Sequence, residues 1–257
     1  MLELKQIEAF FPEHLRPFKR NILREYLQYK ILGVIFGGRH GKGLSFMGGT
    51  AIHIMYGLPR FSEDLDFDNR ALTRDDFRLL SDDVTRALSL EGFSVETGTS
   101  FKGVFSADIK ITGLLFESGV SGHKEEKIRI KLDAEAQKFA YEPERVMVNK
   151  FDVFVGVSAV PVAILLAQKY LAILKRKRVM GRDLYDAIFL SGMAKPDLGY
   201  LQEKTGIANM ADLKSALLKR CAPLDFKILV RDVEGFLFSS ADAKKVLMFQ
   251  EMVRSWT

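Results

Sequence analysis

One short stretch of the chain carries oxygen-bearing side chains at every second position, and their types suit metal chemistry. In RFSEDLDFD, which begins at residue 60, these side chains are Ser62, Asp64, Asp66 and Asp68. Residues two apart on a strand point to the same face, so the four would line up while the apolar side chains between them face a core. Carboxylates this close repel each other unless a cation lies between them, and Mg²⁺ prefers carboxylate oxygens together with substrate phosphates. The stretch therefore predicts either a magnesium site or a solvated acidic edge strand.

A glycine-rich turn stands shortly before this stretch and suits the binding of an anion. Gly48, Gly49 and Thr50 separate an apolar strand at 44–47 from the helical pattern AIHIMYG. Glycine lets the backbone approach a phosphate closely, and the free amides at the start of a helix attract anions. The Thr50 hydroxyl adds a donor. The alternative is an ordinary turn from strand to helix.

Two further positions would join the acids. Arg60 precedes the acidic stretch and could grip a phosphate with its guanidinium, the alternative being a surface ion pair. Residues 127–134 alternate apolar and charged side chains as a strand does, which would place Asp133, with Lys131, beside the same acidic cluster. The alternative is a plain amphipathic strand.

A lysine in an apolar helix marks a third region. Lys169 lies between pairs of apolar residues in LLAQKYLAILK, where its charge is costly unless it reaches water or a partner. Arg176 follows two turns later on the same face. Asp183 and Asp186, three apart, share a face of the next helix. We expect one of the acids to cap the helix or hold Arg182, and Asp186 to lie beside Lys169; the alternative for Lys169 is a side chain that reaches out to solvent.

The elements that must carry these residues change in character along the chain. Helices are predicted over residues 1–32 and over 72–90, where Thr73 is the cap and Gly92 the stop. Strands are predicted at 44–47, 60–68, 93–96, 104–112 and 127–134. From Val160 onward the pattern is helical, with helices near 160–177, 181–192, 197–205, 210–221 and 225–238, and one more before the end. The sequence thus predicts an α+β fold, with a small mixed sheet flanked by helices in residues 1–155 and an all-helical domain in residues 156–257.

Composition narrows the class of protein. The 257 residues contain 47% hydrophobic and 28% charged residues, as in a globular protein, and the single cysteine, Cys221, excludes internal disulfides and Cys-based zinc clusters. The most apolar stretch, 153–167, is shorter than the roughly 20 residues that span a bilayer. We therefore expect a cytoplasmic protein with no membrane segment. The net charge of +5 belongs entirely to residues 151–257, which favours an anionic partner.

Three motifs together resemble a known family. The 22 residues FMGGTAIHIMYGLPRFSEDLDF are similar to the first motif of nucleotidyltransferases of the AbiEii/AbiGii toxin type, within the polymerase-β-like superfamily. KIRIKLDAE resembles the second motif, a Lys-x-Asp strand. LLAQKYLAILKRKRVMGRDLYDAIFL resembles the third, although Gln168 stands where many relatives carry an acid and the run 175–178 is more basic than the pattern requires. A weak fourth motif lies near Asp232 and Phe236.

The resemblance implies transfer of a nucleotide from an NTP to an acceptor hydroxyl, with release of pyrophosphate, in a cleft that the helical domain completes. It implies Mg²⁺ at Asp64, Asp66 and Asp133, with Asp133 as a further metal ligand or as the base. The residues implied to bind the nucleotide are Gly48, Gly49, Thr50, Arg60, Ser62, Lys169, Arg176 and Arg182. Asp186 would orient Lys169 or act as an alternative base.

The resemblance also implies partners. It suggests a toxin of a toxin–antitoxin system with a cognate antitoxin, and an RNA acceptor, most of all the 3′ end of tRNA. The basic run at 175–178 suits such an acceptor, although a solvated helix face would look the same. The alternatives are nucleotidylation of a protein side chain or a small molecule, and a non-catalytic nucleotide-binding module.

Overall fold

The chain forms two compact units, and the computed structural model describes residues 1–256 of it. The first unit comprises Met1–Tyr56, Phe61–Lys138 and Pro143–Ala159. The second comprises Gly57–Arg60, Phe139–Glu142 and the chain from Val160 onward. The motif around the acidic stretch is therefore divided, because Arg60 belongs to the second unit and Phe61 to the first.

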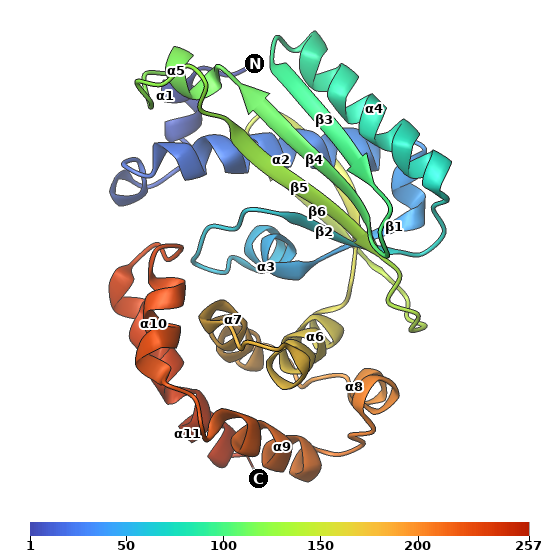
Figure 1. Ribbon diagram of the computed structural model, residues 1–257, viewed down its shortest axis with the longest axis vertical. Coiled ribbons are helices and arrows are strands. Elements are labelled where there is room, and N and C mark those ends of the chain that lie inside the picture. The colour runs from blue at the N-terminus through green and yellow to red at the C-terminus, as the bar shows by residue number, and fades with distance from the viewer. Residues whose placement is uncertain (257) are drawn as a thin grey trace. The chain divides into compact units, whose positions relative to one another are not determined.

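A seven-stranded sheet is the centre of the first unit (Figure 1). Its strands are β1 (Leu44–Met47), β2 (Leu65–Asn69), β3 (Ser94–Ser100), β4 (Phe105–Thr112), β5 (Ile128–Glu135), β6 (Glu144–Lys150) and β7 (Val153–Ala159). Their spatial order is β3-β4-β5-β2-β1-β7-β6. The pairs β2–β5 and β1–β7 are parallel and the others antiparallel, so the predicted mixed sheet is confirmed.

The hairpin of β6 and β7 was not predicted. The apolar run at 153–167 contains both β7 and the first turns of the following helix, so hydropathy alone does not show where one ends and the other begins. The division predicted at residue 155 would cut β7, whereas the whole strand lies in the first unit.

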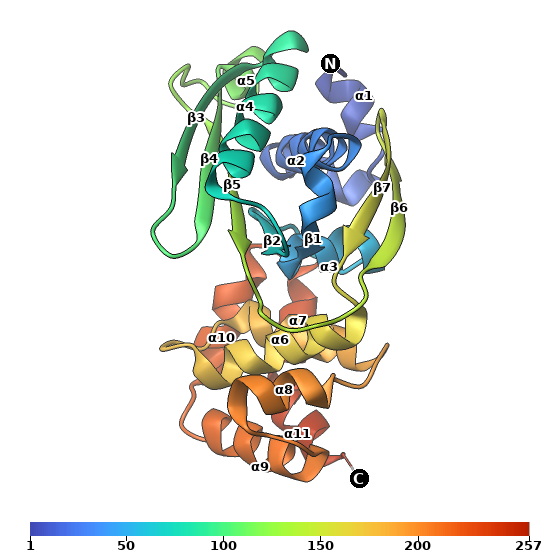
Figure 2. The ribbon, with the colours of Figure 1, turned by 90° about the vertical axis from the view of Figure 1, so that its right-hand side faces the viewer.

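Helix α2 (Lys19–Gly37) lies within the curve of the sheet, with β3–β5 on one side and β6–β7 on the other (Figure 2). The other helices of this unit are α1 (Leu4–Glu8), α3 (Gly48–Tyr56), α4 (Arg74–Leu90) and α5 (Leu114–Glu117), and short 3₁₀ helices cover Glu13–Leu15 and His40–Gly43. The helix predicted across residues 1–32 is interrupted between α1 and α2, where Pro12 and Pro17 lack the amide hydrogen that a helix interior needs. The predicted cap of α4 is confirmed, since the Thr73 side chain accepts a hydrogen bond from the Asp76 amide.

The second unit is helical, as predicted. It contains α6 (Val162–Lys175), α7 (Gly181–Ser191), α8 (Leu198–Thr205), α9 (Met210–Cys221), α10 (Phe226–Glu234), a 3₁₀ helix (Ser240–Met248) and α11 (Phe249–Arg254). The segment Gly57–Arg60 joins it through a β-bridge between Arg60 and Leu237 and through a hydrogen bond from the Phe238 amide to the Pro59 carbonyl, 3.1 Å long. Within residues 1–256, no helix is both long enough and apolar enough to cross a membrane.

Candidate functional site

The acidic stretch is only partly a strand. β2 begins at Leu65, so Ser62 and Asp64 lie in the segment that leads into it, and the prediction of four aligned side chains on one strand is wrong. Leu65 and Phe67 are fully buried, as the alternation predicts. Asp68 is also buried, and its carboxylate accepts a hydrogen bond from the Gln137 amide at 2.8 Å. Asp68 therefore holds the chain that follows β5, which leaves Asp64 and Asp66 as the acids with partial access to solvent.

Asp66 and Asp133 are neighbours in the sheet. β2 and β5 run parallel, with Asp66 opposite Asp133 in the register. Residues paired in this way on adjacent strands project to the same face, and adjacent strands lie about 4.8 Å apart. Two motifs separated by more than 60 residues in the sequence thus place their carboxylates side by side.

Lys131 and Ser106 hold the Asp133 carboxylate. Lys131 Nζ lies 2.6 Å from one carboxylate oxygen, and the Ser106 hydroxyl donates to the other at 2.5 Å. The hydrogen bond to Asp133 raises the pKa of Lys131 against the opposing effect of burial, and the charges of Asp133, Asp64 and Asp66 raise it further. Lys131 is therefore a counter-ion that this group of acids already possesses.

The three carboxylates predicted to bind the metal are not arranged together as a ligand cluster. Across residues 1–256, no three His, Cys, Asp or Glu side chains are arranged so that they could together hold a metal ion. At Asp133, each carboxylate oxygen already has one partner, Ser106 or Lys131. Asp64 and Asp66 remain a donor set of the kind that suits Mg²⁺, which in nucleotide sites is held by one or two carboxylates while substrate phosphates complete its shell.

The glycine turn approaches Asp66 closely. α3 begins at Gly48, whose φ of +80° suits glycine, and a Cβ atom built there would lie 2.1 Å from Asp66 Oδ2. The Asp66 carboxylate therefore lies beside the N-terminus of α3, where the helix dipole stabilises negative charge.

The Thr50 hydroxyl already has a partner within the protein. It is fully buried and donates a hydrogen bond to the Asp64 carbonyl oxygen. In this arrangement the hydroxyl holds the segment that carries Asp64, and its contact with a phosphate stays a prediction. The amides of Gly48 and Gly49 remain the predicted phosphate donors.

In the second unit, Arg60 forms a buried ion pair with Asp186. The Arg60 side chain is 2% exposed and that of Asp186 is fully buried. Arg60 Nε and one terminal nitrogen each donate to a different Asp186 oxygen at 2.7 Å, which is the strong two-pronged form of this pair. Burial would raise the pKa of Asp186, but the charges of Arg60 and Lys169 lower it to about 2. Arg60 thus reaches a carboxylate, and Asp186 is ionised and a poor acceptor of a catalytic proton.

Lys169 lies between both acids of α7. Its Nζ is 2.8 Å from Asp186 and 3.5 Å from Asp183. Asp183 is in turn paired with Arg176 at 2.7 Å, so it does not hold Arg182 as expected. Cations and carboxylates alternate through this network, and it fixes the Lys169 ammonium on α6 at 13% exposure.

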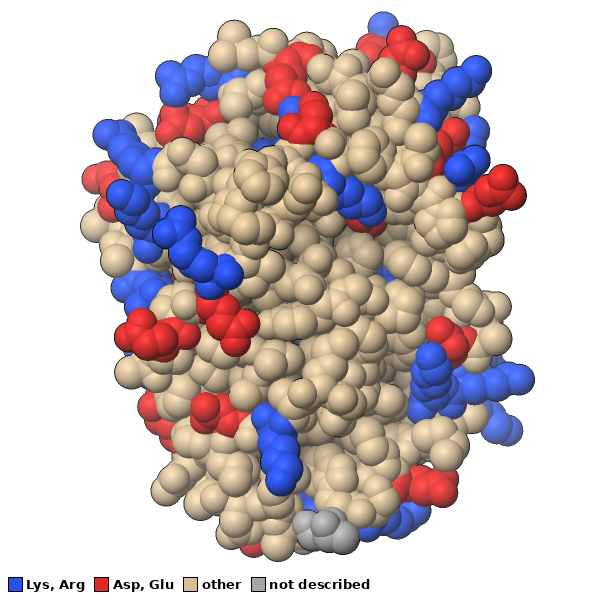
Figure 3. Space-filling view, turned by 180° about the vertical axis from the view of Figure 1, so that it is seen from behind, with Lys and Arg blue, Asp and Glu red and all other residues tan. Residues whose placement is uncertain are grey.

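The basic run at 175–178 is exposed, but it does not form a helix face. α6 ends at Lys175, and the chain leads from there through an exposed connection to α7. Arg178 is paired with Asp232, which also accepts the Gly181 amide at the start of α7. On the face shown in Figure 3, Lys and Arg side chains are interspersed with Asp and Glu. That face is therefore not covered by a broad patch of positive charge or of negative charge.

Sequence reasoning missed several of these relationships. Gln28, Ser106 and Lys150 were not singled out, although each donates a hydrogen bond to a carboxylate or a main-chain carbonyl in the first unit. At Gln28 the sequence shows a polar residue between Leu27 and Tyr29. No sequence signal pairs Arg60 with Asp186, which lies 126 residues later.

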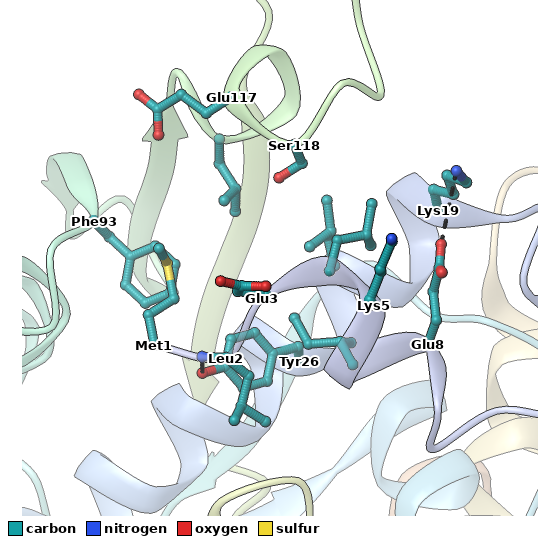
Figure 4. A pocket seen from close by; sticks show the side chains of 14 residues that line it. Met1, Leu2, Glu3, Lys5, Glu8, Lys19, Tyr26, Phe93, Glu117 and Ser118 are labelled. Atoms are coloured by element: carbon teal, nitrogen blue, oxygen red, sulfur yellow. Dashed lines mark hydrogen bonds and ion pairs between the residues drawn. The ribbon is translucent and has the colours of Figure 1, made fainter.

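A cavity of about 570 Å³ in the first unit lies apart from the predicted site residues. Tyr26, Phe93 and Glu117 line it together with α1, and an ion pair joins Lys19 to Glu8 at its rim (Figure 4). None of the predicted catalytic or nucleotide-binding residues lines this cavity.

The comparisons with known proteins agree with the motifs. The family described as "Nucleotidyl transferase AbiEii toxin, Type IV TA system" matches residues 35–245. The crystal structure of JHP933 from Helicobacter pylori has a TM-score of 0.59 and 21% identity, covering 91% of this chain and 90% of that one. MenT4, a nucleotidyltransferase toxin from Mycobacterium tuberculosis H37Rv, has a TM-score of 0.57 and 15% identity, covering 99% and 100%. A putative nucleotidyltransferase from H. pylori has a TM-score of 0.56 and 20% identity, covering 90% and 93%. No curated protein matches the sequence.

Proposed function

The chain belongs to the AbiEii family of nucleotidyltransferase toxins, and from this premise we propose that it transfers a nucleotide from an NTP to the 3′ end of tRNA with the help of Mg²⁺. The family is that of a type IV toxin–antitoxin system, which implies a cognate antitoxin as partner. The observation that carries the proposal is the register of Asp66 with Asp133, beside the N-terminus of α3.

The first unit supplies the acids of the proposed reaction. Asp64 and Asp66 would hold Mg²⁺, whose chemistry is to neutralise phosphate charge during an in-line displacement. The amides of Gly48 and Gly49 would bind phosphate oxygens at the start of α3. Ser62 would add a hydroxyl donor next to Asp64.

The proposed chemistry breaks one bond and forms one. The acceptor hydroxyl oxygen bonds to the α-phosphorus, and the bond from that phosphorus to the oxygen bridging to the β-phosphate breaks, so pyrophosphate leaves. Asp133 would accept the hydroxyl proton or join the metal site, and in either role it would share its carboxylate with Lys131. Asp133 suits the base better than Asp186, because Asp186 is fully buried with a pKa of about 2.

The second unit supplies cations for the triphosphate. Lys169 and Arg176 would contact phosphate oxygens, and Arg182 would add a third cation. Asp186 and Asp183 hold the first two in place through the distances given above. Arg60 supports this arrangement by fixing Asp186, so we assign it a positioning role in place of direct phosphate contact.

A labelling experiment tests the acceptor. The protein is incubated with Mg²⁺ and each labelled NTP, together with either total RNA or cell protein. We expect label in the tRNA fraction that disappears with Asp64→Ala and persists with Asp75→Ala, a matched acid whose side chain is 86% exposed. Label only in protein would contradict the RNA acceptor.

The same samples address the remaining alternative. A non-catalytic nucleotide-binding module would show a rise in thermal stability with Mg²⁺ and NTP but no transfer to any acceptor. Since catalysis requires metal at Asp64 and Asp66, we expect that rise to be lost in Asp64→Ala together with the transfer.

A further inference from the structure

Side chains from two helices hold three consecutive carbonyl groups just before β2. Gln28 Nε2 on α2 donates to the Ser62 carbonyl at 3.1 Å and to the Glu63 carbonyl at 3.0 Å. Thr50 on α3 donates to the next carbonyl, that of Asp64. The main chain that leads to the acidic pair is thus held by side-chain donors at every residue from 62 to 64.

This segment depends on those donors for its shape. The pairing of β2 with β5 starts only at Leu65, opposite Leu132, so no strand ladder fixes residues 62–64. Gln28 and Thr50 are almost completely buried, at 1% and 0% exposure, so water does not readily replace their hydrogen bonds.

α2 reaches the same segment at a second point. Arg24, one turn before Gln28, forms an ion pair with Glu63 at 3.1 Å. Arg24 and Gln28 are four residues apart and therefore share a face of the helix. One face of α2 is thus directed at the segment that carries Asp64.

We propose that Gln28 is a positioning residue that fixes Asp64 for metal binding. The inference rests on the proposed function in taking Asp64 as a metal ligand. Gln28 lies before residue 35, where the family match begins, so the motifs do not include it. Without the Gln28 amide, the carbonyls of two partly buried residues lose the donor that holds them, and the segment is free to shift. Because Mg²⁺ demands near-ideal ligand geometry, a small movement of Asp64 weakens its binding.

The test compares Gln28→Met, which keeps a similar volume without donors, with Ile31→Val, a conservative change at a fully buried position on the same helix. Binding of Mn²⁺ to the free protein is measured by its paramagnetic resonance, and hydrogen exchange is followed in peptides covering residues 61–66. We expect Gln28→Met to bind Mn²⁺ roughly tenfold more weakly and to exchange faster in those peptides, while Ile31→Val behaves like the wild type. If Gln28→Met does not fold, Gln28→Asn replaces it, since that variant keeps a neutral amide but is one methylene shorter.

Enzyme kinetics provide a second measurement, which a general loss of folding stability would not affect in the same way. We expect the half-saturating Mg²⁺ concentration of transfer to rise in Gln28→Met while the KM for NTP at saturating Mg²⁺ stays the same. Wild-type Mn²⁺ affinity and exchange in the variant would overturn the inference. Absence of nucleotide transfer by the wild type would instead overturn the proposed function, and the exchange and Mn²⁺ measurements would still decide the role of Gln28.

Discussion

Gly48 lies so close to Asp66 that a Cβ atom built on it would stand 2.1 Å from Asp66 Oδ2. Real Cβ atoms do not approach an oxygen so closely, so any side chain at residue 48 must displace the carboxylate. The glycine that begins α3 and the acid on β2 are therefore coupled by direct contact, in addition to their nearness in one motif.

The contact predicts that Gly48→Ala disables the enzyme. Displacement of Asp66 should lower the rate of nucleotide transfer by a factor on the order of 100, because misplaced catalytic groups cost about that much. Gly92→Ala is the control, since Gly92 also has a positive φ, +95°, but a Cβ there would meet nothing within 4 Å. Both variants should lose about 1 kcal/mol of folding stability through backbone strain, and only Gly48→Ala should lose activity. Equal activity in the two variants would refute the coupling.

From the Lys131–Asp133 ion pair we predict that removing the lysine charge strengthens metal binding. Lys131→Gln removes the cation that occupies one Asp133 oxygen, so Mn²⁺ should bind to the free protein several-fold more tightly. Folding stability should change by less than about 1 kcal/mol, because Lys131 is 40% exposed. Lys110→Gln on the adjacent β4 is the control, because that lysine is paired with Asp108. Weaker Mn²⁺ binding in Lys131→Gln would show that Lys131 does not compete with the metal.

The buried pair of Arg60 and Asp186 predicts a dependence of stability on pH. The pKa of Asp186 is lowered from 3.8 to about 2, so its contribution is complete above about pH 4 and is lost as the pH falls towards 2. The shift corresponds to about 2 kcal/mol of folding free energy. Urea denaturation of the wild type and of Asp186→Asn measures it.

Near neutral pH, Asp186→Asn should cost about 3 to 5 kcal/mol of folding stability, since it leaves the buried Arg60 and the partly buried Lys169 without their shared carboxylate. The difference in free energy of unfolding between the two proteins should narrow between pH 4 and pH 2. Because the other acids are present in both proteins, this narrowing reports the titration of Asp186. A gap that stays constant over this range would mean that the Asp186 carboxyl has an ordinary pKa.

We predict that Gly181, the first residue of α7, tolerates no larger side chain. A Cβ atom at Gly181 would lie 1.9 Å from the Leu229 carbonyl oxygen on α10, which is main chain and cannot move away cheaply. Gly181→Ala should therefore destabilise the second unit by about 2 kcal/mol, as measured by thermal or urea unfolding. Gly235→Ala, with nothing within 4 Å of its Cβ position, should change the stability by less than half as much.

Much of the architecture follows from local pattern. Thr73 and Asp76 cap α4 as predicted, because a capping box needs only residues three apart in the sequence. The helices α6 to α10 were predicted close to their observed positions for the same reason, since helical periodicity is set by contacts between residues three and four apart. The motifs that carry Asp64, Asp133 and Lys169 are likewise visible in the order of residues.

The sequence by itself therefore determined the fold class, the family and the candidate site residues, all of which depend on local spacing. Only the tertiary structure decided that β2 begins at Leu65, that Asp66 faces Asp133, and that Arg60 binds Asp186. It also showed that Gln28 and Thr50 hold the carbonyls before β2. The physical reason is that strand register, buried ion pairs and side-chain contacts to carbonyls join residues distant in the chain, and packing selects these partners.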